Sequence, residues 1–338
     1  MQTKCFISCI LIRACILLAV CSGFDLYASP SKQVLVNLGR EIFFDKRLSA
    51  NGQVSCASCH KPDHAFTDGL AVSKGVDGKS GTRNAPSLLG VARQNMFFWD
   101  GRRDSLAEQV LDPFINPVEH GFSSHTELIE VLKKEPKYAE QFRRTSANQS
   151  GTINRQAIAE ALVSYLTSLE PTESSFERYQ FKNEKSALTL SQAQGLSLFS
   201  QAGCASCHLI EKSSAPLADG KFHSVGVGLD RIIGKMPALS MKVKTGDAQA
   251  IDHEIVNDAE LAELGRFLVT GDPKDIGKFK TPSLRNAALT APYMHDGSVA
   301  TLEEAVDREL YYRALEIGKS TTLTAEEKSA LLDFLRAL

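Results

Sequence analysis

Residues 56–60 and 204–208 carry the most specific chemistry in this sequence, because both segments read CASCH. C-x-x-C-H is the attachment signal of a c-type haem. The two thiols add to the vinyl groups of the porphyrin, and the histidine that follows ligates the iron. The predicted attachment and ligand residues are Cys56, Cys59, His60, Cys204, Cys207 and His208.

Two other uses of paired cysteines fit this sequence less well. A zinc site needs further Cys or His pairs at regular spacing, and a thioredoxin-like C-x-x-C does not require a histidine after it. The chain has eight cysteines, and those outside the repeated motif lie in the first 21 residues: Cys5, Cys9, Cys15 and Cys21. In a mature chain without this N-terminal segment, no cysteine is left for a disulfide framework or a catalytic thiol. The sequence therefore predicts two covalently bound haem c groups.

The N-terminal segment has the features of a secretory signal. An apolar run at residues 14–21 follows Arg13, and Ala28 offers a small residue for cleavage. A membrane anchor fits less well because the apolar run is short, and a lipoprotein signal ending at Cys21 has an unfavourable valine before the cysteine. We expect residues 1–28 to be removed and the mature protein to lie in the periplasm, since haem c attachment occurs outside the bacterial cytoplasm.

Length and charge set wider limits. The chain has 338 residues, enough for two domains that each bury a core. Its formal net charge is -2, which gives no support to nucleic-acid binding, because that function usually needs a basic surplus. No later segment reaches the length of a membrane span.

The elements that hold the two haem motifs share a pattern of their own. A G-x-x-x-F sequence begins at Gly39 before the first motif and at Gly195 before the second. An internal duplication of one haem-binding helical unit explains this repeat. We therefore expect a mainly α-helical protein with long loops, in which two cytochrome c-like haem domains occupy residues 29–180 and 181–338.

Capping residues place three helices within these domains. Asn154 is expected to begin an apolar helix that Pro171 ends. Residues 191–194 and 324–327 read as capping boxes that open two further helices. The polar, charged residues 172–187 are expected to link the domains.

The loops after each haem motif contain short segments that are weak signals singly and specific together. In the first half they are DHAFTDG at 63–69, RNAPS at 83–87 and FWDGR at 98–102. In the second half they are FHSVG at 222–226, VTGD at 269–272, TPSLRN at 281–286 and TAPYMHDG at 290–297. This set resembles the bacterial di-haem cytochrome c peroxidase and MauG family over nearly the whole mature chain.

The resemblance implies that the haem held by His60 is the one that reduces peroxide. Glu119 matches the family's distal glutamate, and Gln109 matches a distal glutamine ten residues earlier. A carboxylate can carry the proton that moves between the peroxide oxygens, and an amide can orient peroxide and stabilise developing charge. Taken alone, Glu119 would read as a solvated loop residue.

Trp99, the only tryptophan, matches the family's electron relay between the haems; its alternative reading is a core aromatic. The family also has a calcium site between its domains, which Asn84 and the backbone oxygens of Thr290 and Pro292 match. An amide oxygen, two carbonyl oxygens and water molecules suit Ca²⁺. A simple turn at Asn84 is the alternative.

The second axial ligand of the His208 haem is harder to assign. Family members place a methionine or a tyrosine soon after the HDG segment, and that position falls on Glu309 here. We expect Tyr311 to be the ligand, after a two-residue shift in the loop. The alternatives are Tyr312, Glu309 and the thioethers of Met236, Met241 and Met294.

One departure from the family bears on reactivity. Blocked members carry a second histidine that occupies the peroxidatic iron until the partner haem is reduced, and the matching position here is Val76. His64 lies only four residues after His60, on a segment that leaves the proximal side. We therefore expect an open first haem. His120, His125 and His253 are expected at the surface, whereas His223 and His295 are expected to bond a haem propionate or the backbone.

These features indicate a periplasmic cytochrome c peroxidase that reduces hydrogen peroxide with electrons from a small c-type cytochrome or cupredoxin. Electrons would enter at the His208 haem and cross via Trp99 to the His60 haem. One alternative is a MauG-like enzyme that oxidises residues of a protein partner, which the missing blocking histidine favours. The other is a di-haem electron carrier, in which Glu119 has no catalytic role. The sequence leaves homodimer formation open.

Overall fold

The computed structural model describes residues 30–145, 151–318 and 321–338. The expected signal segment, residues 1–28 with its four cysteines, lies outside the described residues. Within the described ranges, no helix is both long and apolar enough to cross a membrane.

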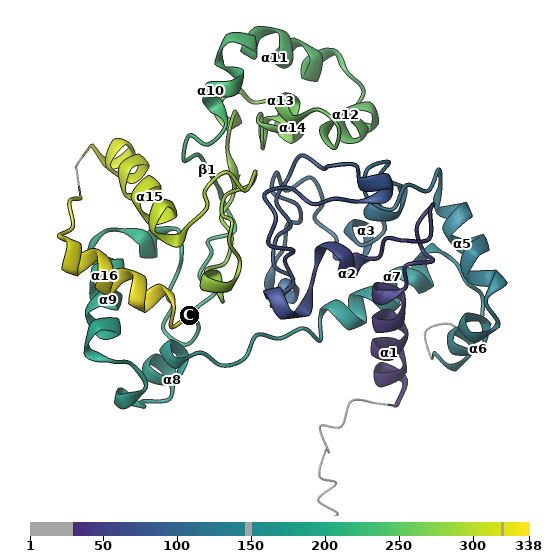
Figure 1. Cartoon of the computed structure of the whole chain (residues 1–338), viewed down its shortest axis with the longest axis horizontal. Coiled ribbons are helices and arrows are strands. Elements are labelled where there is room, and N and C mark those ends of the chain that lie inside the picture. The colour runs from purple at the N-terminus through teal and green to yellow at the C-terminus, as the bar shows by residue number, and fades with distance from the viewer. Residues whose placement is uncertain (1–29, 146–150, 319–320) are drawn as a thin grey trace, which may run out of the picture.

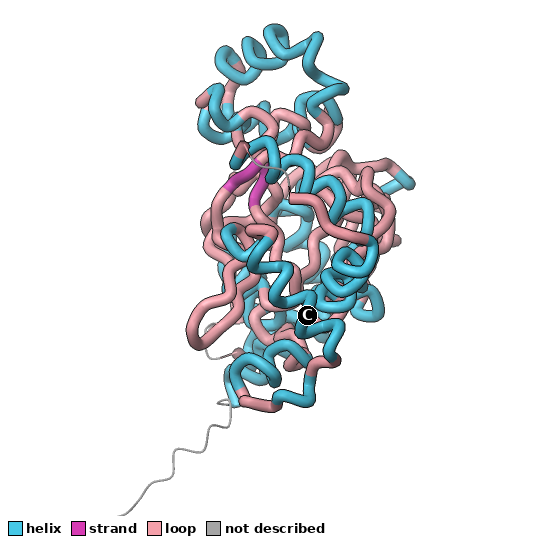
Figure 2. The backbone as a smooth tube through the Cα atoms, turned by 90° about the vertical axis from the view of Figure 1, so that its left-hand side faces the viewer, coloured by secondary structure: helices cyan, strands magenta, loops and turns pink. Residues whose placement is uncertain are grey.

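The described chain is mainly helical, as expected, with long loops between short helices (Figures 1 and 2). Its first helices are α1 (Pro30–Phe44), α2 (Cys56–Cys59), α3 (Leu106–Gln109), α4 (Asp112–Ile115), α5 (His125–Lys134), α6 (Pro136–Arg144) and α7 (Arg155–Leu166). Next come α8 (Ser175–Phe181), α9 (Leu190–Gln201), α10 (Leu229–Ile232), α11 (Met236–Thr245), α12 (Ala248–Ile255), α13 (Ala259–Ala262) and α14 (Phe267–Thr270). The last two are α15 (Leu302–Ile317) and α16 (Ala325–Leu335). Strands β1 (Phe222–His223) and β2 (Phe279–Lys280) pair antiparallel.

The first half is built on the crossing of α1 and α7. Leu38, Ile42 and Phe43 of α1 are at most 2% exposed and belong to one apolar cluster with the buried face of α7. Gly39 makes the crossing close, because a Cβ there would lie 1.9 Å from the carbonyl oxygen of Ala161. A side chain at this position would therefore force the two helices apart.

The second half repeats this kind of crossing with α9 and α16. A Cβ at Gly195 would lie 2.0 Å from the carbonyl oxygen of Ala330. Phe199 of α9 and Phe334 of α16 are buried, and their ring centroids lie 5.3 Å apart in an edge-on contact. In each half, the glycine that opens the G-x-x-x-F pattern thus lies where two helices cross and contacts the backbone of the second helix.

A third apolar cluster lies within residues 229–276 and was not anticipated from the sequence. Its most buried members are Ile232, Leu261, Ala262, Leu264 and Phe267, each at most 1% exposed. Helices α10 to α14 carry this cluster and lie above both halves in Figure 1. The predicted domain 181–338 therefore contains two apolar clusters.

The expected helix starts are mostly confirmed. Asn154 caps α7 by accepting from the Ala157 amide, although the helix ends at Leu166, before Pro171. Residues 324–327 form the expected capping box of α16. The box expected at residues 191–194 is wrong by two positions, because the Thr189 side chain caps α9 together with Gln192. The reason is that S/T-x-x-Q occurs in both registers, and the local sequence does not choose between them.

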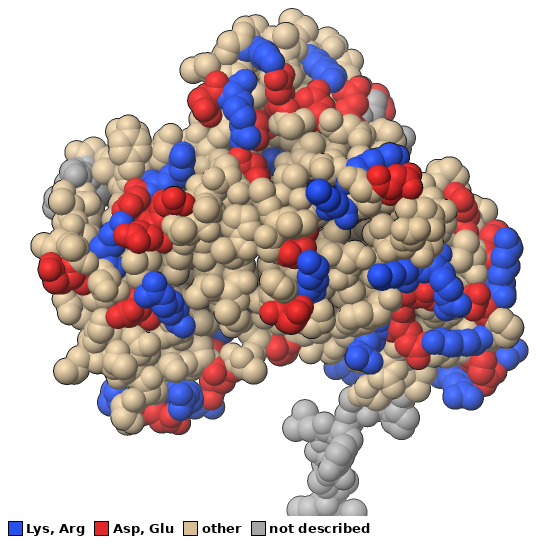
Figure 3. Space-filling view, viewed as in Figure 1, with Lys and Arg blue, Asp and Glu red and all other residues tan. Residues whose placement is uncertain are grey.

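Charged side chains of both signs are interspersed over the face shown in Figure 3. This distribution agrees with the formal net charge of -2. On this face the two signs lie close together, unlike the single-sign patch of a nucleic-acid-binding surface.

Candidate haem sites

The first CASCH segment forms a single helical turn that presents its histidine in a defined orientation. The His60 amide donates to the Cys56 carbonyl oxygen at 2.9 Å, which closes the turn. Nδ1 of His60 lies 2.9 Å from the carbonyl oxygen of Phe66. Because a carbonyl can only accept, Nδ1 carries the proton and Nε2 keeps the lone pair that a metal needs.

The second CASCH segment has the same internal geometry. The His208 amide donates to the Cys204 carbonyl oxygen at 3.0 Å, and Nδ1 of His208 lies 3.0 Å from the carbonyl oxygen of Leu217. Burial lowers the pKa of both ligand histidines, so the neutral imidazole is favoured. Both histidines are thus oriented and protonated as metal ligands should be.

None of the four cysteines forms a disulfide, and all four are partly buried, as haem attachment requires. Sγ of Cys56 lies 3.8 Å from Nε2 of His120, and Sγ of Cys207 lies 3.7 Å from Nε2 of His223. In each motif the two cysteines lie one helical turn apart, and an oriented histidine follows the second cysteine. These residues fit haem c.

Glu119 lies in a tight turn after α4. Its Oε1 accepts from Nδ2 of Asn116 at 2.5 Å. Burial raises the pKa of Glu119 to about 7; the Arg102 guanidinium opposes this rise, and the Asp112 carboxylate adds to it. A carboxyl group with a pKa near neutrality can both accept and return a proton.

The loop that carries Val76 packs directly on the Glu119 turn. Val76 is 3% exposed, and its amide donates to the Glu119 carbonyl oxygen at 2.8 Å. Gly75 permits this contact, because a Cβ there would lie 2.0 Å from the carbonyl oxygen of Val118. An apolar side chain that cannot ligate iron therefore stands beside Glu119. Gln109, at the end of α3, is partly buried and makes no hydrogen bond to Glu119 within the described ranges.

Trp99 lies where the two halves meet. Its indole Nε1 donates to the carbonyl oxygen of Asn84 at 2.9 Å, and its own carbonyl oxygen accepts from the amide of Lys280 on β2 at 2.8 Å. Trp99 is partly buried. One residue therefore bonds to segments that follow the first and the second haem motif.

The residues expected to bind calcium are only partly brought together. Asn84 is 7% exposed, and its Nδ2 donates to the Leu70 carbonyl oxygen at 2.9 Å. The backbone amide of Asn84 donates to the His295 carbonyl oxygen at 2.8 Å. This bond joins Asn84 to the segment that contains Thr290 and Pro292. The side-chain oxygen of Asn84 is thus the atom that could ligate an ion.

The candidates for the second ligand of the His208 haem that lie on α15 differ in exposure and contacts. Tyr311 is 61% exposed, whereas the ring of Tyr312 packs directly on Gly226. The Glu309 carboxylate contributes to the raised pKa of Cys204, so this residue is close to the second motif. The methionines lie differently: Met241 is 61% exposed, and Met236 packs in the 229–276 cluster.

Three further histidines have well-defined partners in the structure. His120 is buried, not on the surface as expected; its Nδ1 lies 2.5 Å from the Leu48 carbonyl oxygen and its ring packs on Phe114. The only available signal was its position beside Glu119. Within the described chain, His223 and His295 bond carboxylates, with Nε2 at 2.8 Å from Asp219 and 2.7 Å from Glu263 respectively.

The other two histidines expected at the surface differ from each other. His253 is exposed, as expected. His125 is partly buried, and its Nε2 lies 3.1 Å from the Leu111 carbonyl oxygen. Neither lies in a haem motif or its flanking loop.

A buried group of Glu263, His295 and Asp296 has ligand atoms within 4.8 Å of one another. Arg231 forms ion pairs with both carboxylates, one of them at 2.7 Å to Glu263. A guanidinium in this position repels a metal cation, so we interpret the group as an ion-pair network rather than a metal site.

Comparisons with known proteins place these features in context. A family model described as di-haem cytochrome c peroxidase matches residues 33–186. The chain is 34% identical over 310 residues to cytochrome-c peroxidase IdrP2 of Denitromonas iodatirespirans, covering 90% of this chain and 81% of the relative. It is 33% identical to methylamine utilization protein MauG of Paracoccus denitrificans, covering 82% and 75% respectively. A solved MauG-like protein associated with microbial copper homeostasis is 31% identical, with a TM-score of 0.72 over 91% of this chain and 90% of that one.

Proposed function

Because this chain belongs to the di-haem cytochrome c peroxidase family, we propose that it reduces hydrogen peroxide to water with two haem c groups. Each peroxide takes up two electrons and two protons and yields two water molecules. When bound, the haem groups supply the iron and the electron storage that this chemistry needs. The observation that carries the proposal is the pair of CASCH turns, whose histidines bond a carbonyl through Nδ1 and keep Nε2 for iron.

The two halves would act as two related haem units, divided near residue 180. The similar helix crossings at Gly39 and Gly195 support this division and the duplication. The first unit would be attached through Cys56 and Cys59 with His60 as iron ligand. The corresponding residues of the second unit are Cys204, Cys207 and His208.

Glu119 would move the proton during peroxide reduction. Its pKa of about 7 lets it take a proton from one peroxide oxygen and return it to the other near neutral pH. Asn116 holds the carboxyl group in place from the same turn. Gln109 would orient peroxide through its amide, although its side chain is not bonded to Glu119 here.

Trp99 would carry electrons between the two units. Its hydrogen bonds to Asn84 and Lys280 hold the indole at the junction of the two halves. The electrons would come from a small c-type cytochrome or cupredoxin, which meets the second unit in the periplasm. The enzyme would work there after removal of residues 1–28, as a monomer or a homodimer.

Two further ligand sites belong to this proposal. Ca²⁺ would be held by the side-chain oxygen of Asn84 with the backbone oxygens of Thr290 and Pro292, near the contact between Asn84 and His295. Tyr311 would supply the second ligand of the His208 haem. Tyr311 is 61% exposed, so its side chain is accessible to such a group.

A second candidate function is oxidation of residues in a protein partner, the activity considered above for MauG-like enzymes. Its support is the buried Val76 in place of a blocking histidine, together with the similarity to MauG itself. Steady-state turnover of peroxide with reduced cytochrome c distinguishes these functions. Rapid oxidation of cytochrome c supports the peroxidase. Slow oxidation of cytochrome c, with peroxide consumed only when a protein partner is present, supports the MauG-like function. If no peroxide is consumed with cytochrome c or with a protein partner, the result supports an electron carrier.

A further inference from the structure

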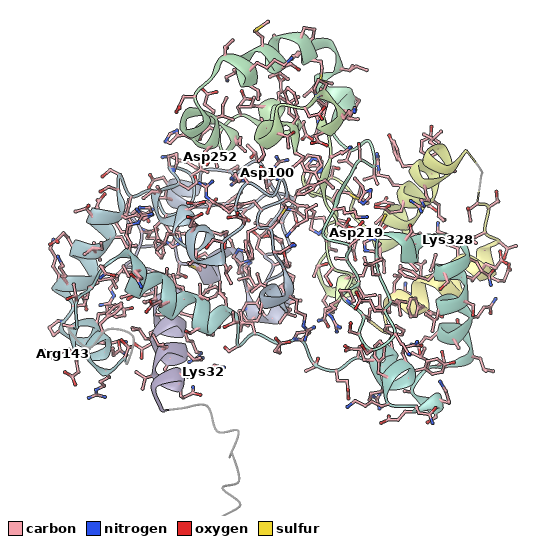
Figure 4. The ribbon with its side chains drawn as sticks, turned by 180° about the vertical axis from the view of Figure 1, so that it is seen from behind. Lys32, Asp100, Arg143, Asp219, Asp252 and Lys328 are labelled. Atoms are coloured by element: carbon pink, nitrogen blue, oxygen red, sulfur yellow. The ribbon has the colours of Figure 1, made fainter. Side chains whose placement is uncertain are left out.

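Helices α10 to α14 and their apolar cluster form a structural unit at residues 229–276 (Figure 1), called the 229–276 unit below. A chain of ion pairs connects this unit to the turn that holds Glu119. Asp252 on α12 lies 2.8 Å from Nη2 of Arg103 and 3.7 Å from Nε of Arg102. Nε of Arg103 lies in turn 2.9 Å from Asp112, at the start of α4. Figure 4 shows Asp252 at the lower edge of the unit, beside the segment that carries Asp100.

These pairs are sheltered from solvent. The side chains of Arg102, Arg103, Asp112 and Asp252 are between 12% and 32% exposed. Arg102 also pairs with Asp100, which is fully buried, at 2.9 Å. Water and salt screen such pairs less than surface ion pairs, so their charges act over a longer range.

The backbone brings this network close to Glu119. The turn after α4 folds back on the helix, with the His120 amide 3.2 Å from the Pro113 carbonyl oxygen and the Phe122 amide 3.0 Å from that of Phe114. Asp112 and Glu119 thus belong to one compact hairpin. Arg102 lowers the pKa of Glu119, and Asp112 raises it.

Other groups face the same turn from the elements packed on it. The thiols of Cys56 and Cys59 on α2 interact with the Glu119 charge, and haem attachment converts them to neutral thioethers. His120 turns its Nδ1 to the Leu48 carbonyl oxygen. From the Val76 loop, Nζ of Lys79 donates to the Pro117 carbonyl oxygen at 3.3 Å. Arg102 and Asp112 therefore differ from these groups in being linked to another structural unit.

We propose that Arg102, Arg103 and Asp112 are positioning residues that set the protonation of Glu119, and that Asp252 couples this setting to the 229–276 unit. The proposal rests on the proposed function, in which Glu119 carries the proton. It makes the 229–276 unit an electrostatic part of the peroxide site, although none of its residues lies in a haem motif. A partner that shifts this unit would change the charge balance around Glu119.

The signs of the expected effects follow from the charges. Asp112→Asn removes a negative charge, so ionised Glu119 is favoured and its titration midpoint falls by roughly half a pH unit or more. Arg102→Gln removes a positive charge and raises the midpoint. Asp252→Asn leaves both arginines less neutralised, so the midpoint falls, but by less than in Asp112→Asn.

The test measures the midpoint in the haem-loaded protein in two ways. Infrared titration follows the protonated carboxyl band, which is assigned to Glu119 by its loss in Glu119→Gln. The pH profile of peroxide turnover gives an independent midpoint. Glu254→Gln is the matched control, because Glu254 also lies on α12 but pairs with Lys242 inside the unit, at 2.6 Å.

Opposite shifts in Asp112→Asn and Arg102→Gln, with a smaller fall in Asp252→Asn and none in the control, support the proposal. Unchanged midpoints, or shifts of one sign in both variants, overturn it. Arg102→Gln could fail to fold because Asp100 loses its partner. In that case, a lower midpoint in both Asp112→Asn and Asp252→Asn than in the control still supports the proposal, and equal midpoints overturn it. Full turnover in Glu119→Gln would instead refute the proposed role of Glu119, while the infrared midpoints would still test the network.

Discussion

Replacing Gly39 with alanine tests whether the first haem unit depends on its helix crossing. The added Cβ would lie 1.9 Å from the carbonyl oxygen of Ala161, whereas ordinary contact begins at 3.4 Å. The helices would have to separate by about 1.5 Å, the difference between these two distances. Leu38 and Ile42, each 1% exposed, would then lose packing against α7.

We expect Gly39→Ala to reduce the free energy of unfolding of the first unit by about 3 kcal/mol, the upper range for overpacked cores. Alanine gains up to about 1 kcal/mol in helix propensity over glycine, which offsets only part of a clash with backbone. For a unit of this size, the unfolding temperature should fall by about 6–12 °C. Gly195→Ala should do the same to the second unit, because its Cβ would lie 2.0 Å from the Ala330 carbonyl oxygen.

Differential scanning calorimetry of the haem-loaded protein measures both effects. Gly234→Ala is the control, since nothing lies within 4 Å of the added Cβ, and it should leave every transition within about 0.5 kcal/mol. Two transitions, each lowered by only one of the glycine variants, would support two units divided near residue 180. An unchanged unfolding temperature in Gly39→Ala would refute the reasoning from the close crossing.

Four further outcomes are expected. Glu119→Gln should leave both haem spectra nearly unchanged and lower peroxide turnover by about 10²-fold or more; unimpaired turnover would place the proton transfer elsewhere. Because burial raises the pKa of Glu119 to about 7 and only the ionised form accepts a proton, wild-type turnover should rise as the pH increases through 7, and this rise should be absent from the variant. Since Val76 cannot ligate iron, electron paramagnetic resonance of the fully oxidised protein should show a high-spin first haem; a purely low-spin spectrum would contradict this, and a high-spin signal only in His64→Ala would identify His64 as a ligand. Intact mass should show two haems, and Cys204→Ala with Cys207→Ala should lose one; a single haem in the wild type would exclude the two-haem proposal.

Features that depend on a few neighbouring residues could be predicted from the sequence. The cap at Asn154 and the capping box at residues 324–327 need only local side-chain and backbone contacts. Gly39 and Gly195 could be matched by their spacing, although only the structure shows which carbonyl oxygen each one meets. The box at residues 191–194 shows the limit of local reasoning, because an equivalent pair two residues earlier competes for the same helix.

Features that depend on contacts distant in the sequence could not be predicted in this way. His120 is polar and lies in a loop, and only the fold places it between Leu48 and Cys56. The pairing of Arg103 with Asp252 joins residues 149 apart, and no periodicity links them. Glu119 could be matched to a family position, but a pKa near 7 arises from burial and from charges supplied by Arg102 and Asp112. A candidate proton-carrying residue can therefore be proposed from a family match in the sequence. Its pKa depends on the three-dimensional arrangement of charges, and Asp252 of the 229–276 unit pairs with two of the arginines involved.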